Sequence, residues 1–430
     1  MSDLLSAIGK AYAHSEGGEL SNRELRDRLV RDGVVDEASL RERVQIGKER
    51  HSPAQIRLRW AQQSLRAQGL LERDKGCRGR WRLTAQGHRK YTEAAPGAVL
   101  LACSTSLGIA IWARNEDVFS AGRGIDVPLG LMITSPPYPL QKARAYGNPP
   151  EHEYVDFICR ALEGVLKNLV DGGSVVLNVT NDAFLAKSPE RSIYKYRLVV
   201  ALHDRLGLHL MDEQPWVNKS KAPGPIQWAS LRRVQMNVAY EPCLWFTNNP
   251  HAVRADNRRI LEPHSKEHLA LIARGGENRR MVTSDGAYRL KPGSFGRPTA
   301  GRIPRNVIEA GHRCPGQTLY KRAAGELGLP VHGAPMPESV AERWIRFLTD
   351  PADPLPVADI FAGTLTVPAV CERLGIPWVA VDMMAEPLRA GAERLRWGGA
   401  QEFELGPELE AWYEQFRKGP PENYALAFGE

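Results

Sequence analysis

Residues 131–138 read LMITSPPY, an apolar stretch that ends in polar residues, two prolines and an aromatic residue. The apolar part suits a strand buried on both faces of a parallel sheet. In open α/β sheets, ligands bind beyond the carboxyl ends of such strands. We therefore expect residues 134–138 to form a functional loop at the edge of a sheet.

Strand-like and helix-like stretches alternate on both sides of this loop, which predicts a doubly wound α/β sheet. The same pattern assigns residues 99–247 and 331–430 to one domain, with 248–330 as a basic insert that lacks clean periodicity. The expected strands are 174–179, 238–246, 357–360 and 379–382, and the expected helices are 155–169, 197–206 and 338–348.

Residues 1–93 have a different pattern, in which helices precede a short basic hairpin. Ser21 and Glu24 have the spacing of a capping box at a helix start. A second helix is expected over residues 53–68, because its apolar residues recur at helical spacing. The side chains predicted to point inward from it are Ile56, Trp60 and Leu65.

The charge of the 430-residue chain is unevenly distributed around its net value of +7. Residues 50–90 hold eleven Lys and Arg against two acids, and residues 250–330 hold fifteen against seven. Two basic segments in an otherwise acidic chain indicate a polyanionic partner, although solvated surface faces would give the same counts.

The chain has no long apolar run or leader-like start, so we expect a cytoplasmic protein without a membrane span. Its six single cysteines predict neither a disulfide framework nor a metal site.

The loop at 134–138 suits chemistry on a weakly nucleophilic amine. Prolines fix φ and lack an N–H donor, which leaves the Ser135 hydroxyl and the Pro136 carbonyl to accept hydrogen bonds, with Pro137 stiffening the turn. Acceptors that hold both N–H bonds of an exocyclic amine favour a localised lone pair, and positioning then lowers the barrier to methyl transfer. Tyr138 can stack on a planar base that has left its duplex.

A second loop, Asp359-Ile360-Phe361-Ala362-Gly363-Thr364, also follows an expected strand. Gly363 allows close approach of backbone and ligand. Asp382 ends the next strand, where an acid of a nucleotide-type βαβ unit can bind ribose hydroxyls. A third segment, HGAPMPE at 332–338, leads into an expected helix.

In this order, the segments resemble motifs IV, VI, VIII, X, I and II of the β group of amino-DNA methyltransferases, with motifs VI and VIII at 171–177 and 240–246. The resemblance implies S-adenosylmethionine as cofactor and double-stranded DNA as partner. The cofactor residues that it implies are Thr134, Pro335, Asp359, Phe361, Ala362, Gly363, Thr364 and Asp382. Ile360, Leu365 and Val367 depart from the usual Pro, Gly and Thr.

The run from Gly69 to Gly87 resembles the winged-helix domain at the N-terminus of Mrr-type restriction proteins. That likeness implies duplex contact through the N-terminal domain. The resemblance to the methyltransferases assigns target recognition to residues 248–330. The arginines expected to contact DNA are Arg57, Arg59, Arg78, Arg80, Arg258, Arg259, Arg279, Arg280, Arg302 and Arg305.

Ser at the first position of motif IV is typical of the cytosine-N4 branch, while adenine-N6 enzymes more often have Asp or Asn.

Two further alternatives stay open. Cys243 after Pro242 would serve carbon-5 methylation, but a core cysteine fits the apolar strand better. Leu365 would suit a non-catalytic DNA-binding regulator, against which the intact loop at 134–138 and Asp382 argue. The family implies a restriction–modification system with a cognate endonuclease; the oligomeric state stays open, a homodimer included.

Overall fold

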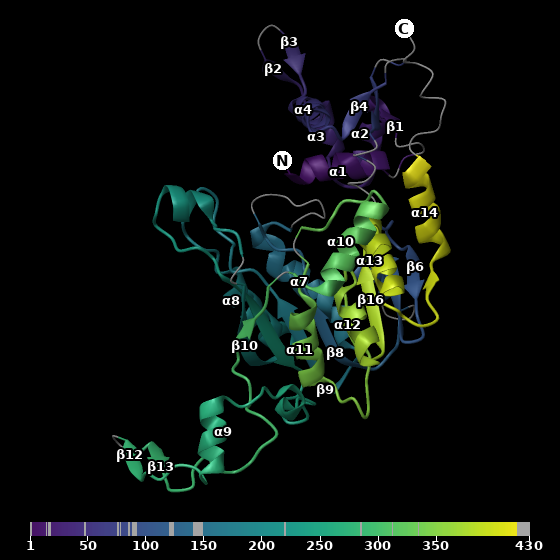
Figure 1. Cartoon of the computed structure of the whole chain (residues 1–430). Helices are drawn as coiled ribbons and strands as arrows, with labels where there is room; N and C mark the ends of the chain where they lie inside the picture. The colour runs from purple at the N-terminus through teal and green to yellow at the C-terminus, as the bar shows by residue number, and fades with distance from the viewer. Residues whose placement is uncertain are drawn as a thin grey trace.

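A ten-stranded sheet organises the larger part of the molecule (Figure 1). The computed structural model describes residues 2–13, 15, 19–46, 49–74, 77, 79–84, 87, 93–119, 124–140, 149–218, 221–283, 286–311, 313–333 and 335–418. The strand order is β14-β10-β11-β9-β8-β15-β16-β7-β6-β17. The strands are β6 (Val99–Ser104), β7 (Gly108–Ala113), β8 (Leu129–Thr134), β9 (Leu169–Asn178), β10 (His209–Val217), β11 (Tyr240–Thr247), β14 (Ile308–Glu309), β15 (Val357–Asp359), β16 (Trp378–Asp382) and β17 (Glu404–Leu405).

The centre of this sheet is parallel, as the doubly wound prediction requires. Strands β9, β8, β15, β16 and β7 run in one direction, and β11 and β6 flank them in the opposite direction. Residue Leu131 of β8 is paired with Val357 of β15, so the two strands end side by side. We call the edge where β8, β9, β15 and β16 end the carboxyl edge, and the opposite one the amino edge.

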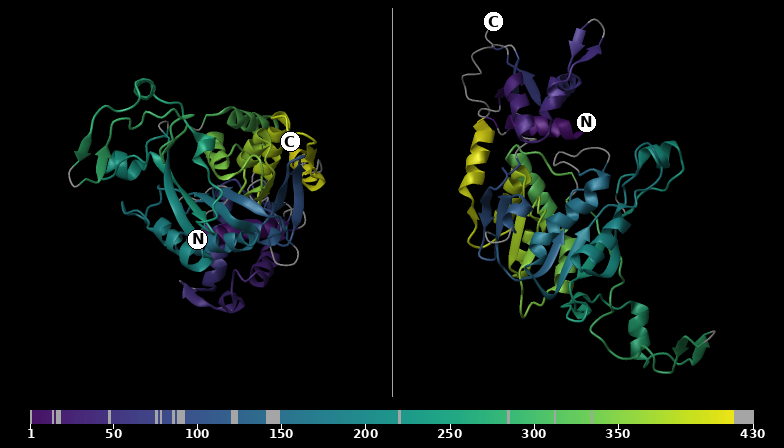
Figure 2. Two further views of the ribbon diagram at one scale, coloured as in Figure 1. Left: turned by 90° about the horizontal axis from the view of Figure 1, so that it is seen from below. Right: turned by 180° about the vertical axis from the view of Figure 1, so that it is seen from behind.

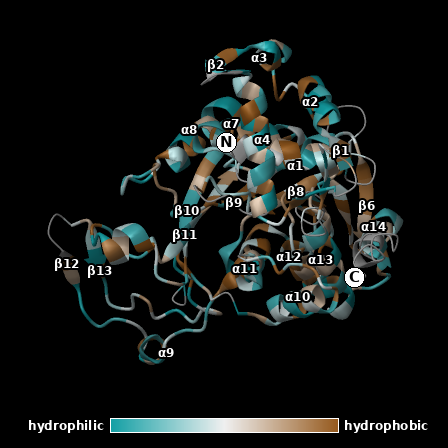
Figure 3. Cartoon of the chain, turned by 90° about the horizontal axis from the view of Figure 1, so that it is seen from above, coloured by the Kyte–Doolittle hydropathy of each residue, from teal (hydrophilic) through white to brown (hydrophobic). Residues whose placement is uncertain are grey.

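Helices cover both faces of the sheet. Cores of buried side chains lie between the helices and the strands, with Trp344 and Trp378 on one face and Tyr154 and Leu198 on the other. In the view from above, the central strands are coloured as hydrophobic (Figure 3). The first face carries α11 (Glu338–Leu348), α12 (Thr366–Leu374) and α13 (Ala385–Trp397), and the second carries α7 (Tyr154–Leu166) and α8 (Tyr194–Leu206). The helix α10 (Pro315–Glu326) packs against α13.

The N-terminal domain combines helices with a three-stranded sheet of order β1-β5-β4. Ser21 and Glu24 form the predicted capping box at the start of α2, with reciprocal hydrogen bonds of 3.2 and 2.7 Å. The elements are α1 (Ser2–Ala13), β1 (Glu19–Ser21), α2 (Asn22–Arg31), α3 (Glu37–Arg41), β2 (Val44–Ile46), β3 (Glu49–His51), α4 (Pro53–Ala67), β4 (Leu71–Arg73) and β5 (Arg80–Leu83).

One expectation for α4 is wrong. Trp60 is 70% exposed, while Leu58, Ala61 and Leu65 are buried. The apolar residues of this helix fit two helical phases, and packing against α1 selects the one that leaves Trp60 outside.

The N-terminal domain joins the larger domain at the carboxyl edge (Figures 1 and 2). The Ala94 N–H donates to the Met383 carbonyl at 2.8 Å, and Glu93 forms a β-bridge with Met384. Lys10 of α1 pairs with Glu93 at 2.7 Å. The connection is therefore fixed within two residues of Asp382.

The basic insert leaves the sheet at the amino edge. β11 runs opposite to β9, so Thr247 lies beside Ser174, far from the carboxyl end of β9. The following chain is held at this edge by the Asp256 N–H, which donates to the Phe347 carbonyl at 2.9 Å. Beyond it, α9 (Lys266–Ala273), β12 (Met281–Thr283) and β13 (Tyr288–Leu290) project away from the sheet (Figure 2). Among the described residues, no helix is both long and apolar enough to cross a membrane.

Candidate active site

A cleft with about 400 Å³ of open space lies at the carboxyl edge. It brings together the three segments that the sequence singled out, because β8 and β15 are neighbours and the segment before α11 packs across their ends. The lining residues are Ser135, His332, Pro335, Met336, Asp359, Phe361, Ala362, Gly363, Thr364 and Thr366.

Asp359 is held at the end of β15 by the neighbouring strand. Its carboxylate accepts a hydrogen bond from the Thr134 hydroxyl at 2.7 Å and from the Phe361 N–H at 3.3 Å. Burial raises the pKa of Asp359 to about 7, which the two hydrogen bonds only partly offset. Thr134 is fully buried behind this carboxylate and does not line the cleft, so its contribution to cofactor binding would be indirect.

Asp382 occupies the corresponding place at the end of β16. Its two carboxylate oxygens accept from the Gly363 N–H at 2.6 Å and from the Met384 N–H at 2.8 Å. Burial raises the pKa of Asp382 to about 6. Gly363 has φ 45°, and a Cβ there would lie 3.9 Å from the Asp382 carboxylate. A left-handed glycine next to an acid thus leaves the backbone open towards the cleft.

Leu365 preserves the loop where the resemblance expects a glycine. It adopts the left-handed conformation, with φ 55° and ψ 42°, directly before α12. A non-glycine residue pays roughly 1–2 kcal/mol for this conformation. The Leu365 side chain is fully buried and packs next to Gly391, and burial of a leucine stabilises the fold by roughly 1.5–3 kcal/mol. The missing glycine is therefore compensated by packing.

The hydroxyl groups of Ser135 and Tyr138 belong to one hydrogen-bonded chain. They lie 3.1 Å apart, and the Tyr138 hydroxyl donates to the Glu241 carboxylate at 2.9 Å. Lys221 pairs with the other oxygen of Glu241 at 3.0 Å. Burial, with the nearby Glu241 charge, raises the pKa of Tyr138 well above its usual value, so this hydroxyl stays protonated and acts as a donor.

Asn178 completes the polar surroundings of this chain. Its side-chain oxygen lies 3.0 Å from the Tyr138 hydroxyl and 3.4 Å from that of Ser135. The carboxylate of Glu241 is the stronger acceptor for the single Tyr138 proton, because a charge-assisted hydrogen bond is favoured. The Ser135 proton then points to Tyr138 or Asn178, and its lone pairs are left to face the cleft.

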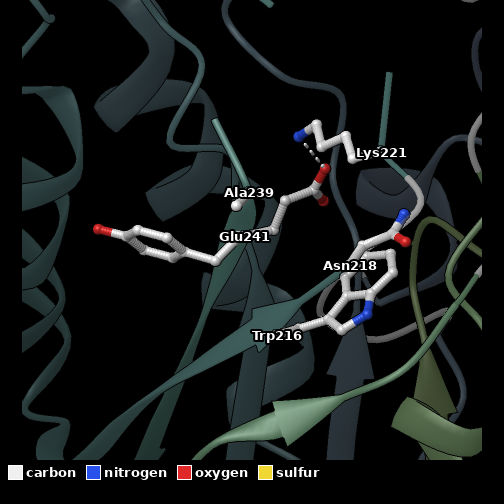
Figure 4. A pocket seen from close by; sticks show the side chains of 6 residues that line it. Trp216, Asn218, Lys221, Ala239 and Glu241 are labelled. Carbon is white, nitrogen blue, oxygen red and sulfur yellow. Dashed lines mark hydrogen bonds and ion pairs between the residues drawn. The ribbon is translucent and has the colours of Figure 1, made fainter. Parts of the chain in front are cut away.

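Sequence reasoning missed Asn178, Glu241 and Lys221. A signal existed for two of them, because Asn178 ends β9 and Glu241 begins β11 at the carboxyl edge. Glu241 and Lys221 also line a smaller pocket of about 130 Å³, in which Figure 4 shows their ion pair above Trp216 and Asn218. Lys221 follows a strand end without any motif of its own.

Cys243 is fully buried in β11. Burial raises the pKa of its thiol to about 12, so a reactive thiolate is disfavoured at neutral pH. This agrees with its expected place in an apolar strand and argues against carbon-5 chemistry.

The predicted DNA-contacting arginines fall into two groups. Arg57 and Arg59 are exposed on α4, and Arg279, Arg280 and Arg305 are exposed without a described ion pair. The others have acidic partners: Arg80 lies 3.6 Å from both Glu19 and Glu24, Arg258 pairs with Asp256, Arg259 with Asp350, and Arg302 with Glu262. Arg78 lies outside the described residues.

A carboxylate-lined cleft beside a Ser-Pro-Pro-Tyr loop, at the carboxyl edge of a doubly wound sheet, is the arrangement of a methyltransferase that acts on base amino groups. The family described as DNA methylase matches residues 129–393, and the chain belongs to this family. The family described as Mrr N-terminal domain matches residues 1–93, which confirms the resemblance inferred there.

A sequence relative and a solved structure are similar to this chain over much of its length. The type II methyltransferase M.PvuII of Proteus hauseri is 32% identical over 270 residues, which cover 63% of this chain and 78% of that protein. The solved structure of PvuII DNA methyltransferase (cytosine-N4-specific) superposes with a TM-score of 0.53 at 26% identity, and covers 74% of this chain and 94% of that one.

Proposed function

We propose that this enzyme transfers a methyl group from S-adenosylmethionine to the N4 amino group of a cytosine that has been flipped out of duplex DNA. The observation that carries the proposal is the shared cleft, in which Ser135 faces the loop of Asp359 and Gly363. The cytosine-N4 specificity of the PvuII enzyme supports the choice of base.

The cleft fits a positively charged nucleoside cofactor. Asp359 lines the cleft, Asp382 lies behind the lining residue Gly363 and accepts from its N–H, and the backbone at Gly363 permits close approach. Asp382 is placed to accept from ribose hydroxyls, while Asp359 faces the part of the cleft next to Ser135. When bound, S-adenosylmethionine supplies the electrophilic methyl group.

The chain of Ser135, Tyr138 and Glu241 prepares the target amine. The Ser135 hydroxyl and the Pro136 carbonyl each accept a hydrogen bond from one N–H group of the amine. The Tyr138 ring, whose hydroxyl is held by Ser135 and Glu241, stacks on the base. After attack on the methyl carbon, the nitrogen must lose one proton. It passes to Ser135 as the Ser135 proton moves to Tyr138 and the Tyr138 proton moves to Glu241.

The alternative of a non-catalytic DNA-binding regulator was based on Leu365. It is no longer supported by that residue, because the loop at Leu365 keeps the left-handed geometry that a glycine would supply. We infer that the enzyme acts in the cytoplasm, in a restriction–modification system with a cognate endonuclease. The N-terminal match to an Mrr domain and the type II methyltransferase among the relatives support the restriction–modification context.

Mass spectrometry of nucleosides from plasmid DNA treated with the enzyme and S-adenosylmethionine tests the proposal. N4-methylcytosine is the expected product. N6-methyladenine would select the adenine alternative, and 5-methylcytosine would contradict the role of Ser135. Absence of any methylated nucleoside, together with absence of cofactor binding in calorimetry, would instead support a non-catalytic DNA-binding regulator.

A further inference from the structure

The connection between β10 and β11 stands beside the active site. Val217 and Tyr240 are paired in the two strands, so the chain between them leaves and re-joins the sheet at the carboxyl edge. Two views show it as a protrusion next to the upper end of the sheet (Figures 1 and 2). We call residues 221–239 the β10–β11 arm.

The arm has its own internal structure. The Ala229 N–H donates to the Pro225 carbonyl at 2.8 Å, Val234 to Trp228 at 2.9 Å, and Val238 to Gly224 at 2.8 Å. Backbone bonds of this kind fix the direction of the side chains between them. The arm is therefore a shaped surface feature.

This shape presents apolar side chains to solvent. Leu231 is 68% exposed, Val234 58% and Met236 84%, with Ile226 at 64%. Several exposed apolar side chains in one short segment indicate a contact surface, because their burial against a partner is favourable. Arg232 and Arg233 are exposed between them, and residues 221–239 contain no acid.

The base of the arm is connected to the catalytic chain. Lys221 pairs with Glu241, whose carboxylate accepts from Tyr138, which lies 3.1 Å from Ser135. The arm therefore begins at a residue that is linked to Ser135 through one ion pair and two hydrogen-bond contacts. Apolar wedges flanked by cations are what proteins insert between base steps when they unstack DNA.

We propose that the β10–β11 arm penetrates the duplex at the target base pair. Leu231, Val234 and Met236 fill the space that the extruded cytosine leaves, and Arg232 and Arg233 contact the flanking phosphates. The inference rests on the proposed cytosine methylation and adds the device that opens the duplex.

The positive charge of the β10–β11 arm indicates that its binding partner is DNA, and not a second copy of this chain. A two-fold interface brings the same patch of both copies together. It would place the arginines of both arms in one contact, without an acid in either arm to pair with them. A polyanion matches the same surface directly.

A matched pair of double variants tests the arm. Leu231→Ala/Val234→Ala removes two arm side chains, while Leu210→Ala/Val200→Ala removes the same two residue types from β10 and α8, where they are 45% and 58% exposed. Each protein is assayed on a duplex with a paired target cytosine and on one in which an abasic site faces that cytosine. N4-methylcytosine is the readout, and sedimentation gives the oligomeric state.

The arm variant is expected to lose about tenfold or more in kcat/KM on the paired duplex and to stay within about threefold of wild type on the abasic duplex, where little unstacking is needed. The control should match wild type on both. An equal loss on both duplexes, no loss on either, or a changed oligomeric state would overturn the arm inference alone. A wild-type enzyme without N4-methylcytosine on either duplex would overturn the proposed function, and the arm inference with it.

Discussion

Ser135 has one proton and two lone pairs, and its neighbours decide how both are used. Its hydroxyl lies within reach of Tyr138 and Asn178, so its proton points away from the cleft. We expect Ser135→Ala to lower kcat by about 100-fold, the scale of losing one preorganised polar contact in a transition state. Cofactor affinity in calorimetry should change little. A single-turnover rate equal to that of wild type would refute the role of Ser135.

Glu241 and Tyr138 are expected to act as one unit. Glu241→Gln leaves a weaker acceptor for the Tyr138 hydroxyl, and Tyr138→Phe removes the donor. Each variant should lose about tenfold in kcat, and the double variant should lose little more, since residues in one hydrogen-bonded network are not additive. Single-turnover rates of the four proteins measure the coupling. If the losses in rate of the two single variants add fully in the double variant, Glu241 and Tyr138 act independently.

Asp359 and Asp382 give cofactor binding a pH dependence. Their pKa values of about 7 and about 6 lie above the 3.8 of a free aspartate. A cationic cofactor favours the ionised forms, so its affinity should rise between about pH 5 and about pH 7.5, with proton release on binding. Without cofactor, the folded state holds protons that the unfolded state has lost, so stability should fall over the same rise in pH.

Calorimetry in buffers of different ionisation enthalpy checks the proton release. Asp382→Asn serves as the control, and it should bind more weakly with a flatter pH profile. An affinity that does not vary between pH 5 and pH 7.5 would show that neither carboxyl titrates on binding.

At the scale of elements, a buried ion pair ties the cofactor loop to two helices. Arg394 of α13 is 1% exposed and pairs with Glu338 of α11 at 2.6 Å. It also donates to the Thr364 carbonyl and the Thr366 hydroxyl, both at 3.1 Å. The strands alone therefore do not position the loop.

Arg394→Met should destabilise the protein by about 3 kcal/mol, because it leaves Glu338 buried without this partner. The loss lies at the low end of such effects, since Arg373 still reaches Glu338 at 3.4 Å. Denaturant unfolding measures it, and Glu338→Gln combined with Arg394→Met should recover part of the loss. A single variant as stable as wild type would show that the pair contributes nothing.

The helix α4 carries two exposed arginines, Arg57 and Arg59, without a described ion pair. Arg57→Ala/Arg59→Ala should weaken DNA binding and reduce the slope of log K against log salt by about two, if each side chain contacts one phosphate. Arg23→Ala provides a control, because Arg23 is exposed on α2 next to Asp27. An unchanged salt slope in titrations would exclude these two contacts.

Across the whole molecule, the site residues that could be predicted from sequence are those that follow parallel strands. Ser135 and Asp359 could be predicted because parallel strands collect the ends of their loops at one edge. Glu241 was missed although it lies at the same edge, because it begins an antiparallel strand and its partner Tyr138 is 103 residues away in the chain. Trp60 was misassigned because a short amphipathic helix does not fix its own phase.

The reversal at β11 places the first part of the insert at the amino edge, whereas Ile308 and Glu309 return to pair with Trp216 and Val217 at the carboxyl edge. Residues 248–330 were expected to hold the target-recognition region, yet α9 and the β12–β13 hairpin extend from the amino edge. Composition located the positive charge correctly but could not tell which edge of the sheet would carry it. The role of this segment in reading DNA stays a prediction.

The attachment of the N-terminal domain has a consequence for ligand binding. Ala94 is bonded to Met383, and Glu93 is bridged to Met384, so these two residues of the connection are fixed next to the strand end that carries Asp382. If the N-terminal domain binds the duplex and Asp382 binds the cofactor, as proposed, the two sites are connected through this attachment. Binding of DNA and binding of the cofactor would then be linked, and by thermodynamic reciprocity each ligand would change the affinity for the other by the same factor.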